Sequence, residues 1–380
     1  YLLFISLVSL AGGVLNAQHR FAAAAATPML LNLCLIGAVF GLAPLTPTPG
    51  HALAWGVFAA GIVQGAFLFA ALRRAGERLA LVRPSFGPKI RLLLRRALPV
   101  AVGAGVYQVN LFVDMIVASF LPSGSISYLF YADRINQLPL GVVGVAVGTA
   151  LLPMLARQLA AGDTSGAHHS QNRAIEFALL LTLPAAAALL VIAQPVTATL
   201  FGRGAFGPAE IAATAAALAV YAAGLPAYVL AKALTPAFYA REDTATPVKI
   251  AAVCMGANLV LNLALMGPLL HVGIALATAL SAWLNVLLLA RALAKRGHLA
   301  LDARLKARVP RQAAAAAVMA AALALLLPIL APWLGGGEFS RALALAALVA
   351  AGLGVFALMA RGLGAASLGD ARALLRGRKD

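Results

Sequence analysis

Charged residues are scarce in this sequence. Asp, Glu, Lys and Arg make up 11% of its 380 residues, and only 12 of them are acidic. Soluble domains carry about 25% charged and about 45–50% apolar residues. Here the hydrophobic fraction is 62% and the mean hydropathy is +0.93. The composition therefore excludes an ordinary soluble domain and predicts a protein that crosses a membrane several times.

The sequence also lacks the residue patterns of enzymes and metal centres. Its two cysteines, Cys34 and Cys254, fall in apolar stretches without a CxxC or Cys/His spacing, so we expect them to pack rather than to bind metal or form a disulfide. No HExxH, P-loop or Ser/His/Asp pattern is present. We predict that the protein is not an enzyme and needs no cofactor or metal.

Long apolar runs dominate the chain. A helix needs about 20 apolar residues to cross a bilayer, and we expect an all-α polytopic fold with about 11 transmembrane helices. Because Tyr1 lies inside an apolar run without an initiator Met, we expect the chain to be part of a longer protein. The runs are 1–17, 26–43, 51–72, 97–121, 125–156, 174–201, 208–237, 249–267, 271–293, 312–331 and 340–361.

The basic residues fall in alternate loops. Twenty-five of the 29 lie in every second loop and in the tail, whereas the opposite loops hold only Arg203, with Arg341 just beyond the last. By the positive-inside rule the richer side is cytoplasmic, and so is the C-terminus. We interpret the net charge of +17 as topology and contact with anionic membrane lipids, not as a nucleic-acid surface.

Two basic connections divide the chain. We predict the last three spans of an N-lobe at 1–72, a linker at 73–96, a six-helix C-lobe at 97–293, a second linker at 294–311, a helix pair at 312–361 and a cytoplasmic tail at 362–380. Part of 73–96 combines Arg and Lys with leucines, which is typical of an amphipathic interfacial helix. A basic hinge between two bundles fits the same residues.

One uncharged run contains an adjacent acid and base. Asp133 and Arg134 lie within 125–157, SISYLFYADRINQLPLGVVGVAVGTALLPMLAR. Counting from the loop at 121–124, Arg134 lies roughly 13–15 Å into the membrane at about 1.5 Å per residue. A charge at that depth costs at least about 2.5–3.5 kcal/mol, so such residues usually face a wet cavity and have a function.

Three segments carry a family resemblance: SLAGGVLNAQHRFAAAAATPMLLN (9–32), YADRINQLPLGVVGVAVGTALLPMLAR (131–157) and LTPAFYAREDTATPVKIA (234–251). The chain resembles the MurJ/MviN-type lipid II flippases of the multidrug/oligosaccharidyl-lipid/polysaccharide exporter superfamily, over the last 11 of their 14 spans. The resemblance implies two six-helix lobes around a cavity, a groove for the lipid tail between two further helices, and alternating access. It implies transport of lipid II, the undecaprenyl-pyrophosphate-linked disaccharide peptide, across the bacterial inner membrane beside other cell-wall synthesis machinery.

The candidate substrate site is Arg134 with Asp133 and Gln137. Arg134 matches the family's cavity arginine on this span, and a guanidinium stays charged and grips phosphate oxygens with two hydrogen bonds. The chain departs from the family at Gln137, where many members have glutamate. The alternative is that Asp133 and Arg134 only neutralise each other or join helices, although adjacent helical residues point about 100° apart.

A second polar set lies in other spans. It consists of Asp114, Asn258, Asn262 and Thr278, whose oxygens suit a hard cation such as Na⁺. The set resembles a sodium site of some family members, except that Asn262 stands where they have a second carboxylate. Hydrogen bonding between helices is the alternative role.

Two further features have open interpretations. Arg241, Glu242 and Asp243 lie at the ends of two spans, where ion pairs would hold an intracellular gate, although exposed pairs contribute only about 0–1 kcal/mol each. The helix pair at 312–361 suits either a tail groove or ordinary lipid-facing helices. A multidrug or other lipid-linked oligosaccharide exporter coupled to a cation is the alternative function; a non-transporting scaffold would give the buried charges no role.

Overall fold

The computed structural model describes residues 1–18, 20–77 and 87–365. Within these ranges it contains ten α-helices, one short 3₁₀ helix and no strand, so the predicted all-α class is confirmed. Two compact units divide the chain, Tyr1–Leu93 and Leu94–Asp380. Much of the predicted linker 73–96 and most of the tail 362–380 lie outside the described residues, and the predicted domain limits remain a prediction.

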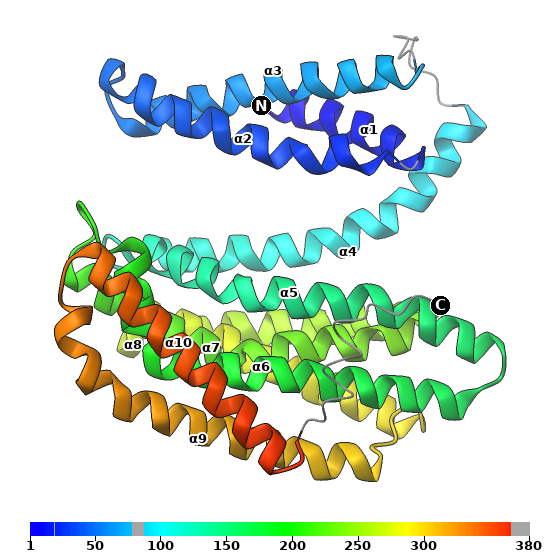
Figure 1. The fold of residues 1–380 in the computed structure, drawn as a ribbon. Coiled ribbons are helices and arrows are strands. Elements are labelled where there is room, and N and C mark those ends of the chain that lie inside the picture. Colours follow the sequence, from blue (N-terminus) through cyan, green and yellow to red (C-terminus); the bar gives the residue numbers. More distant parts are fainter. Residues whose placement is uncertain (19, 78–86, 366–380) are drawn as a thin grey trace. The chain divides into compact units, whose positions relative to one another are not determined.

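Unit 1 contains α1 (Leu2–Ala17), α2 (Phe21–Gly41), the 3₁₀ helix η1 (Ala43–Leu45) and α3 (Pro49–Arg74), with α1 and α2 both packed on α3 (Figure 1). Small residues allow close approach. A Cβ atom at Gly61 would lie 2.8 Å from Phe4 Cβ, and one at Gly56 would lie 2.7 Å from Ala38 Cβ. Larger side chains at these two positions would push the helices apart.

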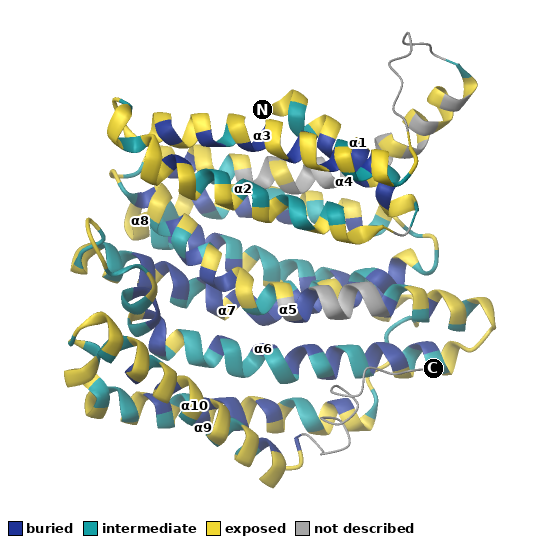
Figure 2. Cartoon of the chain, turned by 45° about the horizontal axis from the view of Figure 1, so that its top comes forward, coloured by how far each residue is buried: buried dark blue, intermediate teal, exposed yellow. Residues whose placement is uncertain are grey.

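Unit 2 contains most of α4 (Pro88–Ser119), then α5 (Ser125–Ala160), α6 (Thr164–Phe201), α7 (Pro208–Tyr239), α8 (Ala245–Lys295), α9 (Ala303–Leu334) and α10 (Glu338–Gly362). Helix α7 is the centre of this unit, because it packs against α5, α6 and α8. Figure 2 shows α7 largely buried, whereas α9 and α10 are largely exposed. Apolar exposure of this kind is expected of helices that face lipid.

Helix α8 folds back on itself. Leu270 has φ 51° and ψ −133°, two residues after Pro268, and a Cβ atom at Gly273 would lie 2.3 Å from the carbonyl oxygen of Leu265. Residues eight apart are about 12 Å apart along a straight helix, so the chain must reverse here. The two halves correspond to the apolar runs 249–267 and 271–293.

The described helices extend beyond several predicted apolar runs. Helix α6 begins at Thr164 rather than 174, and α9 begins at Ala303 rather than 312. Their added turns are polar but are started by side-chain caps: Asp163 accepts a hydrogen bond from Gly166 N, and Asp302 accepts one from Leu305 N. Hydropathy does not detect a capped polar turn, although it is a regular part of the helix.

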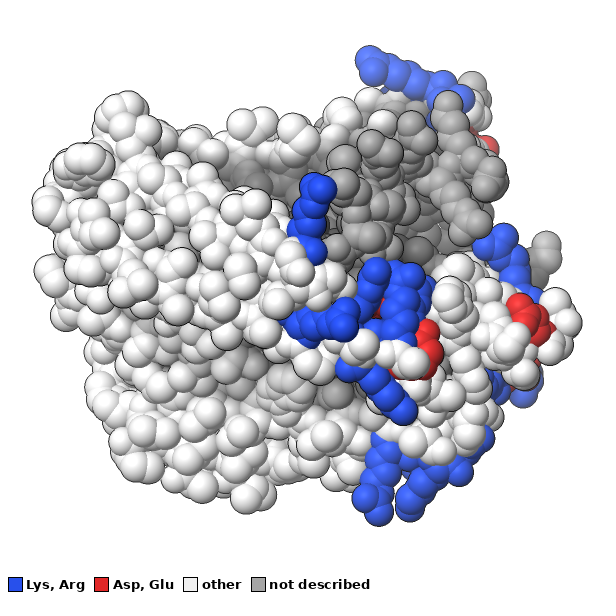
Figure 3. All heavy atoms as spheres, turned by 60° about the horizontal axis from the view of Figure 1, so that its bottom comes forward, with Lys and Arg blue, Asp and Glu red and all other residues white. Residues whose placement is uncertain are grey.

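Successive helices of unit 2 run in opposite directions, so its loops gather at two ends. We define the charged end by loops 161–163, 240–244 and 296–302, and the opposite end by loops 120–124, 202–207 and 335–337. On the face shown in Figure 3, the described lysine, arginine, aspartate and glutamate side chains lie towards one side, and the described surface on the other side is white. Seven described helices are long and apolar enough to cross a membrane, and the protein is a multi-pass membrane protein.

Candidate functional site

Asp133 and Arg134 point in different directions on α5. The Asp133 carboxylate accepts a short hydrogen bond from Gln137 Nε2, one turn along the same helix. The Arg134 guanidinium is exposed, with its Cζ atom 5.2 Å from the ring centroid of Phe130. Asp133 therefore fixes Gln137 rather than Arg134.

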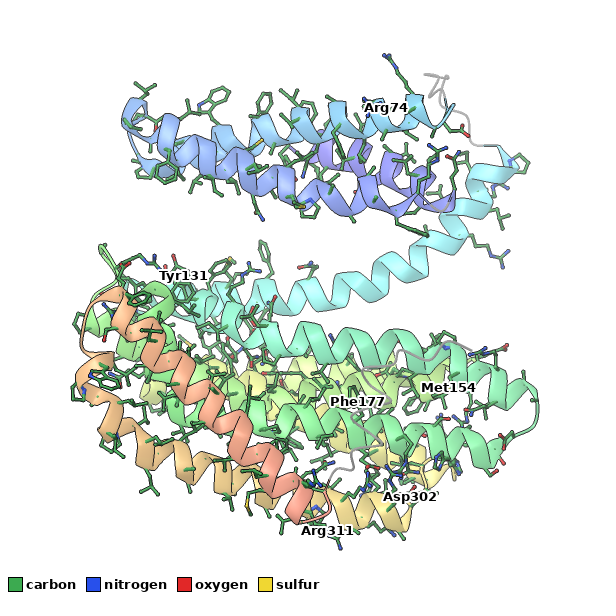
Figure 4. All side chains as sticks on the ribbon, in the orientation of Figure 1. Arg74, Tyr131, Met154, Phe177, Asp302 and Arg311 are labelled. Carbon is green, nitrogen blue, oxygen red and sulfur yellow. The ribbon has the colours of Figure 1, made fainter. Side chains whose placement is uncertain are left out.

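Arg134 is a cation without a carboxylate partner in the described part of the chain. Its contact with Phe130 orients the side chain and leaves its hydrogen-bond donors available. Tyr131, three residues before Arg134, lies near the opposite end (Figure 4), and its ring packs against the rings of Phe201 and Phe206. The arrangement offers a positioned guanidinium that can bind an anion.

Gly144 of α5 leaves room for a second cation, Lys232, beside this helix. A Cβ atom at Gly144 would lie 2.8 Å from Lys232 Cδ and 3.0 Å from Lys232 Nζ. Lys232 belongs to α7 and is exposed. The small residue at 144 thus accommodates the lysine side chain.

The predicted cation set converges in part. Asn262 Nδ2 donates to Asp114 Oδ1 at 2.6 Å and to Asn258 Oδ1 at 3.0 Å, and Asn258 Nδ2 lies 3.5 Å from Ser281 Oγ. These contacts join α4 to both halves of α8. Asn262 is fully buried, and its Oδ1 atom has no hydrogen-bond partner in the described structure. Thr278 donates to Ile274 O in its own helix at 3.0 Å, and no hydrogen bond joins it to Asp114 in the described structure.

The predicted gate residues make their contacts within unit 2. Asp243 forms an ion pair with Arg296 and accepts from Thr246 N at 3.0 Å, while Arg241 donates to Ala237 O at 2.7 Å. Bonding to Thr246 and Arg296 lowers the pKa of Asp243 from 3.8 to about 2. Glu242 is exposed, and the described ion pairs do not include it. The gate role remains a prediction.

A pocket of about 210 Å³ lies beside this loop, between α7 and the two halves of α8. Its polar lining consists of Thr235, Tyr239 and Asn285. None of the residues predicted for substrate or cation binding lines it. The pocket therefore does not coincide with the candidate site.

The sequence interpretation missed an ion-pair cluster at the charged end. Glu176 of α6 accepts hydrogen bonds from Arg173, Arg304 and Arg308, although the latter two are more than 120 residues away in sequence. Burial raises the pKa of Asp302, but the hydrogen bond from Leu305 N and the charge of Arg173 outweigh burial and leave that pKa below its usual value. In the sequence, the only signal of the Glu176 cluster is that Glu176 follows Arg173 by three residues.

Comparison with known proteins decides the family. The model of the family "Lipid II flippase MurJ" matches residues 1–344. The chain belongs to this family. A "Probable lipid II flippase MurJ" of Rhizobium meliloti (strain 1021) is 46% identical over 374 residues, covering 97% of this chain and 70% of the relative. The family resemblance predicted from sequence is confirmed.

Other MurJ relatives are more distant or overlap less. A "Probable lipid II flippase MurJ" of Vibrio cholerae is 40% identical over 366 residues, with 95% of this chain and 68% of the relative covered. For the "Lipid II flippase MurJ" of Burkholderia cenocepacia the identity is 36%, and the chain spans 58% of that relative. A solved structure of "Lipid II flippase MurJ, inward closed conformation" matches with a TM-score of 0.73 at 23% identity, over 95% of this chain and 72% of that one.

The family consists of transporters and not of enzymes, as the sequence analysis predicted. The solved MurJ structure shows that the fold is shared. The roles of individual residues rest on the contacts of this chain.

Proposed function

We propose that this chain takes part in flipping lipid II, the lipid-linked peptidoglycan precursor, for cell-wall synthesis. Family membership supports the substrate. The main support for the site is the environment of Arg134. Its guanidinium is exposed on α5, is oriented by Phe130 and has no carboxylate partner among the described residues. A pyrophosphate is the part of lipid II that such a group binds best, through paired charge-assisted hydrogen bonds.

Asp133 and Gln137 complete the site by shaping its hydrogen bonding. Because Gln137 donates one amide hydrogen to Asp133, its carbonyl oxygen remains an acceptor for sugar or peptide groups. Arg134 then binds the pyrophosphate together with cations from the other lobe of the full-length protein. Binding favours one conformation, and rocking of the lobes exposes the head group on the other side of the membrane.

The asymmetric charge supports an orientation of the chain in the membrane. In unit 2 the described lysines and arginines other than Arg134 and Lys232 lie at or near the charged end, except Arg203 and Arg341. We assign the charged end and the C-terminus to the cytoplasm of a bacterial inner membrane. Lipid II then moves from the cytoplasmic to the periplasmic leaflet, where the cell-wall synthesis machinery uses it.

The apolar outer faces of α9 and α10 suit the polyprenyl tail. Leu325, Ile329, Leu353 and Leu358 are each at least 64% exposed. A tail that stays against these helices never has to cross the polar interior. Only the head group then needs the hydrated cavity.

Sodium is the proposed coupling ion. Asp114 supplies a carboxylate, and the unpartnered Oδ1 of Asn262 is a buried acceptor that a cation would satisfy. Residues Asp114, Asn258 and Asn262 would hold the ion, and Ser281 lies next to them in place of Thr278. Without sodium the same residues serve as hydrogen bonds between helices.

Complementation tests the function. A full-length protein carrying this chain is expressed in cells depleted of their own lipid II flippase. We expect rescue by the unchanged protein, loss of rescue with Arg134→Ala, and poor rescue with Arg134→Lys because lysine lacks the planar fork. Arg203→Ala is the matched control, since Arg203 is exposed and donates to Leu200 O of the helix it follows.

Protein levels are measured in every strain. Full rescue by both Arg134 variants would remove Arg134 from the mechanism. Failure of the well-expressed unchanged protein would contradict the flippase assignment itself.

A further inference from the structure

The Glu176 cluster has no part in the proposed binding of the head group. Its centre is a carboxylate that is only 7% exposed. Arg173 approaches it from the preceding turn of α6, while Arg304 Nε at 3.2 Å and Arg308 Nη1 at 2.5 Å approach from α9. Three guanidinium groups therefore converge on one acid from two helices.

Hydrogen bonds extend this contact along α9 and into the loop before it. Asn172 Nδ2 donates to Ala300 O at 2.7 Å, and Gln312 Nε2 donates to Glu176 O at 3.4 Å. Asp302 forms an ion pair with Arg173 and also caps α9. Figure 4 places Asp302 and Arg311 at the beginning of α9, among many nitrogen-bearing side chains. A shift of α9 by one turn would break all of these pairings together.

The other end of the helix pair is also fixed on α6. Arg341 of α10 donates to the carbonyl oxygens of Ala198 and Gly202 at 3.2 and 3.3 Å. These carbonyls lie at the C-terminal end of α6, where few backbone amides are left to pair with them, and Ala198 O also accepts from Gly202 N at 2.9 Å. Thus α9 is attached at the charged end and α10 at the opposite end.

Helix α6 is the one other helix of unit 2 on which the described residues of α9 and α10 pack. Among the described residues, α9 and α10 pack against α6 and against each other, and against no other helix of unit 2. Their remaining surface is exposed and apolar (Figure 2). In a membrane such a pair gains little from burying apolar surface, because lipid is equally apolar. Polar contacts therefore add to van der Waals packing in fixing its position.

We infer that Glu176, with Arg304 and Arg308, is a positioning cluster that holds α9–α10 in register on α6 and so keeps the tail-binding face in place during transport. The inference rests on the proposed function for its substrate. It assigns Glu176 a role in tail binding without any contact to the head group. A purely structural role for the cluster would make no difference between long and short lipid tails.

Tail length therefore provides the test. The full-length protein is purified in nanodiscs, and its affinity is measured for lipid II and for an analogue with the same head group and pyrophosphate on a short prenyl chain. We expect Glu176→Gln to weaken binding of lipid II about fivefold or more and to leave the short-chain analogue within about twofold. Asp163→Asn is the matched control, because Asp163 caps α6 at the same end and asparagine also caps well.

Arg304→Gln is a milder second variant. Arg304 is 43% exposed, and its loss leaves Arg173 and Arg308 on Glu176. We expect Arg304→Gln also to weaken binding of lipid II more than binding of the short-chain analogue, but by a smaller factor than Glu176→Gln. Equal weakening of both ligands, or weakening of neither, would overturn the inference.

Hydrogen exchange separates this inference from the proposed function. We expect the amides of residues 300–312 to exchange at least about tenfold faster in Glu176→Gln than in the unchanged protein. Unchanged exchange would overturn the cluster's positioning role. If the unchanged protein bound neither lipid II nor the analogue, the proposed function would fail, and the tail-binding role would fall with it even where exchange is faster.

Discussion

Arg134 and Glu176 differ in how completely the protein satisfies their charges. Glu176 is buried and accepts hydrogen bonds from three arginines of two helices. Arg134 is exposed, and its guanidinium lies over the ring of Phe130. A charge whose hydrogen bonds are all used by the protein has little capacity left for a ligand. A charge that the fold orients but leaves unpaired is available for one. The difference separates residues that hold this fold together from residues that bind its substrate.

The largest expected effect on stability is that of Glu176→Ala. Removing the acid leaves three arginines close together without their shared partner, and breaking a buried pair of this kind costs about 3–5 kcal/mol. Thermal unfolding of the purified protein measures the loss. Asp133→Ala is the comparison, because Asp133 bonds only Gln137 in the described contacts, and we expect a change below about 1 kcal/mol. Equal losses of stability in Glu176→Ala and Asp133→Ala would contradict the distinction between a structural and a substrate-binding charge.

Sodium dependence sharpens the comparison at Asp114. If the ion binds only the folded protein, NaCl at 100 times its dissociation constant adds about 2.7 kcal/mol of stability relative to choline chloride. We expect Asp114→Asn to remove this difference. Thr278→Val should preserve it, since the Thr278 hydroxyl already donates to Ile274 O. A sodium effect that survives Asp114→Asn would leave the cluster with hydrogen bonding as its role.

Asp243 provides a smaller, pH-dependent effect. Its pKa falls from 3.8 to about 2 on folding, so its stabilisation is complete above about pH 4 and is lost as the pH falls towards 2. We expect Asp243→Asn to be less stable than the unchanged protein by up to about 1 kcal/mol at pH 6, with the difference vanishing near pH 2. Chemical unfolding at several pH values measures it. Glu242→Gln is the control, and a difference independent of pH would contradict the assignment.

The turn inside α8 should give a similarly small effect of the opposite sign. Leu270 has φ 51°, where a side chain is strained and glycine is not. We expect Leu270→Gly to raise the stability by about 1 kcal/mol. Leu269→Gly is the matched control, since Leu269 is similarly exposed but its φ is not positive. A loss of stability in Leu270→Gly would mean that the leucine side chain contributes more than its backbone strain costs.

The sequence predicts features that depend on consecutive residues and misses those that depend on distant ones. Hydropathy located the helices, including both halves of α8, because apolar runs are a property of consecutive residues. It missed the first turns of α6 and α9, which are polar and depend on the caps Asp163 and Asp302. The polar residues within the spans suggested a cation set of Asp114, Asn258, Asn262 and Thr278. Hydrogen bonds join the first three, Thr278 donates to Ile274 O of its own helix, and the cation role stays a prediction.

The Glu176 cluster could not be found in this way. Its partners Arg304 and Arg308 are 128 and 132 residues away in sequence. In the sequence they are ordinary basic residues of a cytoplasmic connection. Only the packing of α9 on α6 turns them into partners of one buried acid.

The most direct test compares two properties of two variants. Lipid II affinity and thermal stability are measured for Arg134→Ala and Glu176→Ala in the full-length protein, with the short-chain analogue as the ligand so that tail binding does not enter. We predict that Arg134→Ala weakens the affinity at least about tenfold with little change in unfolding temperature. Glu176→Ala should lower the unfolding temperature and, where folded, bind the analogue normally. An Arg134→Ala protein that is unstable but binds with unchanged affinity would contradict the account.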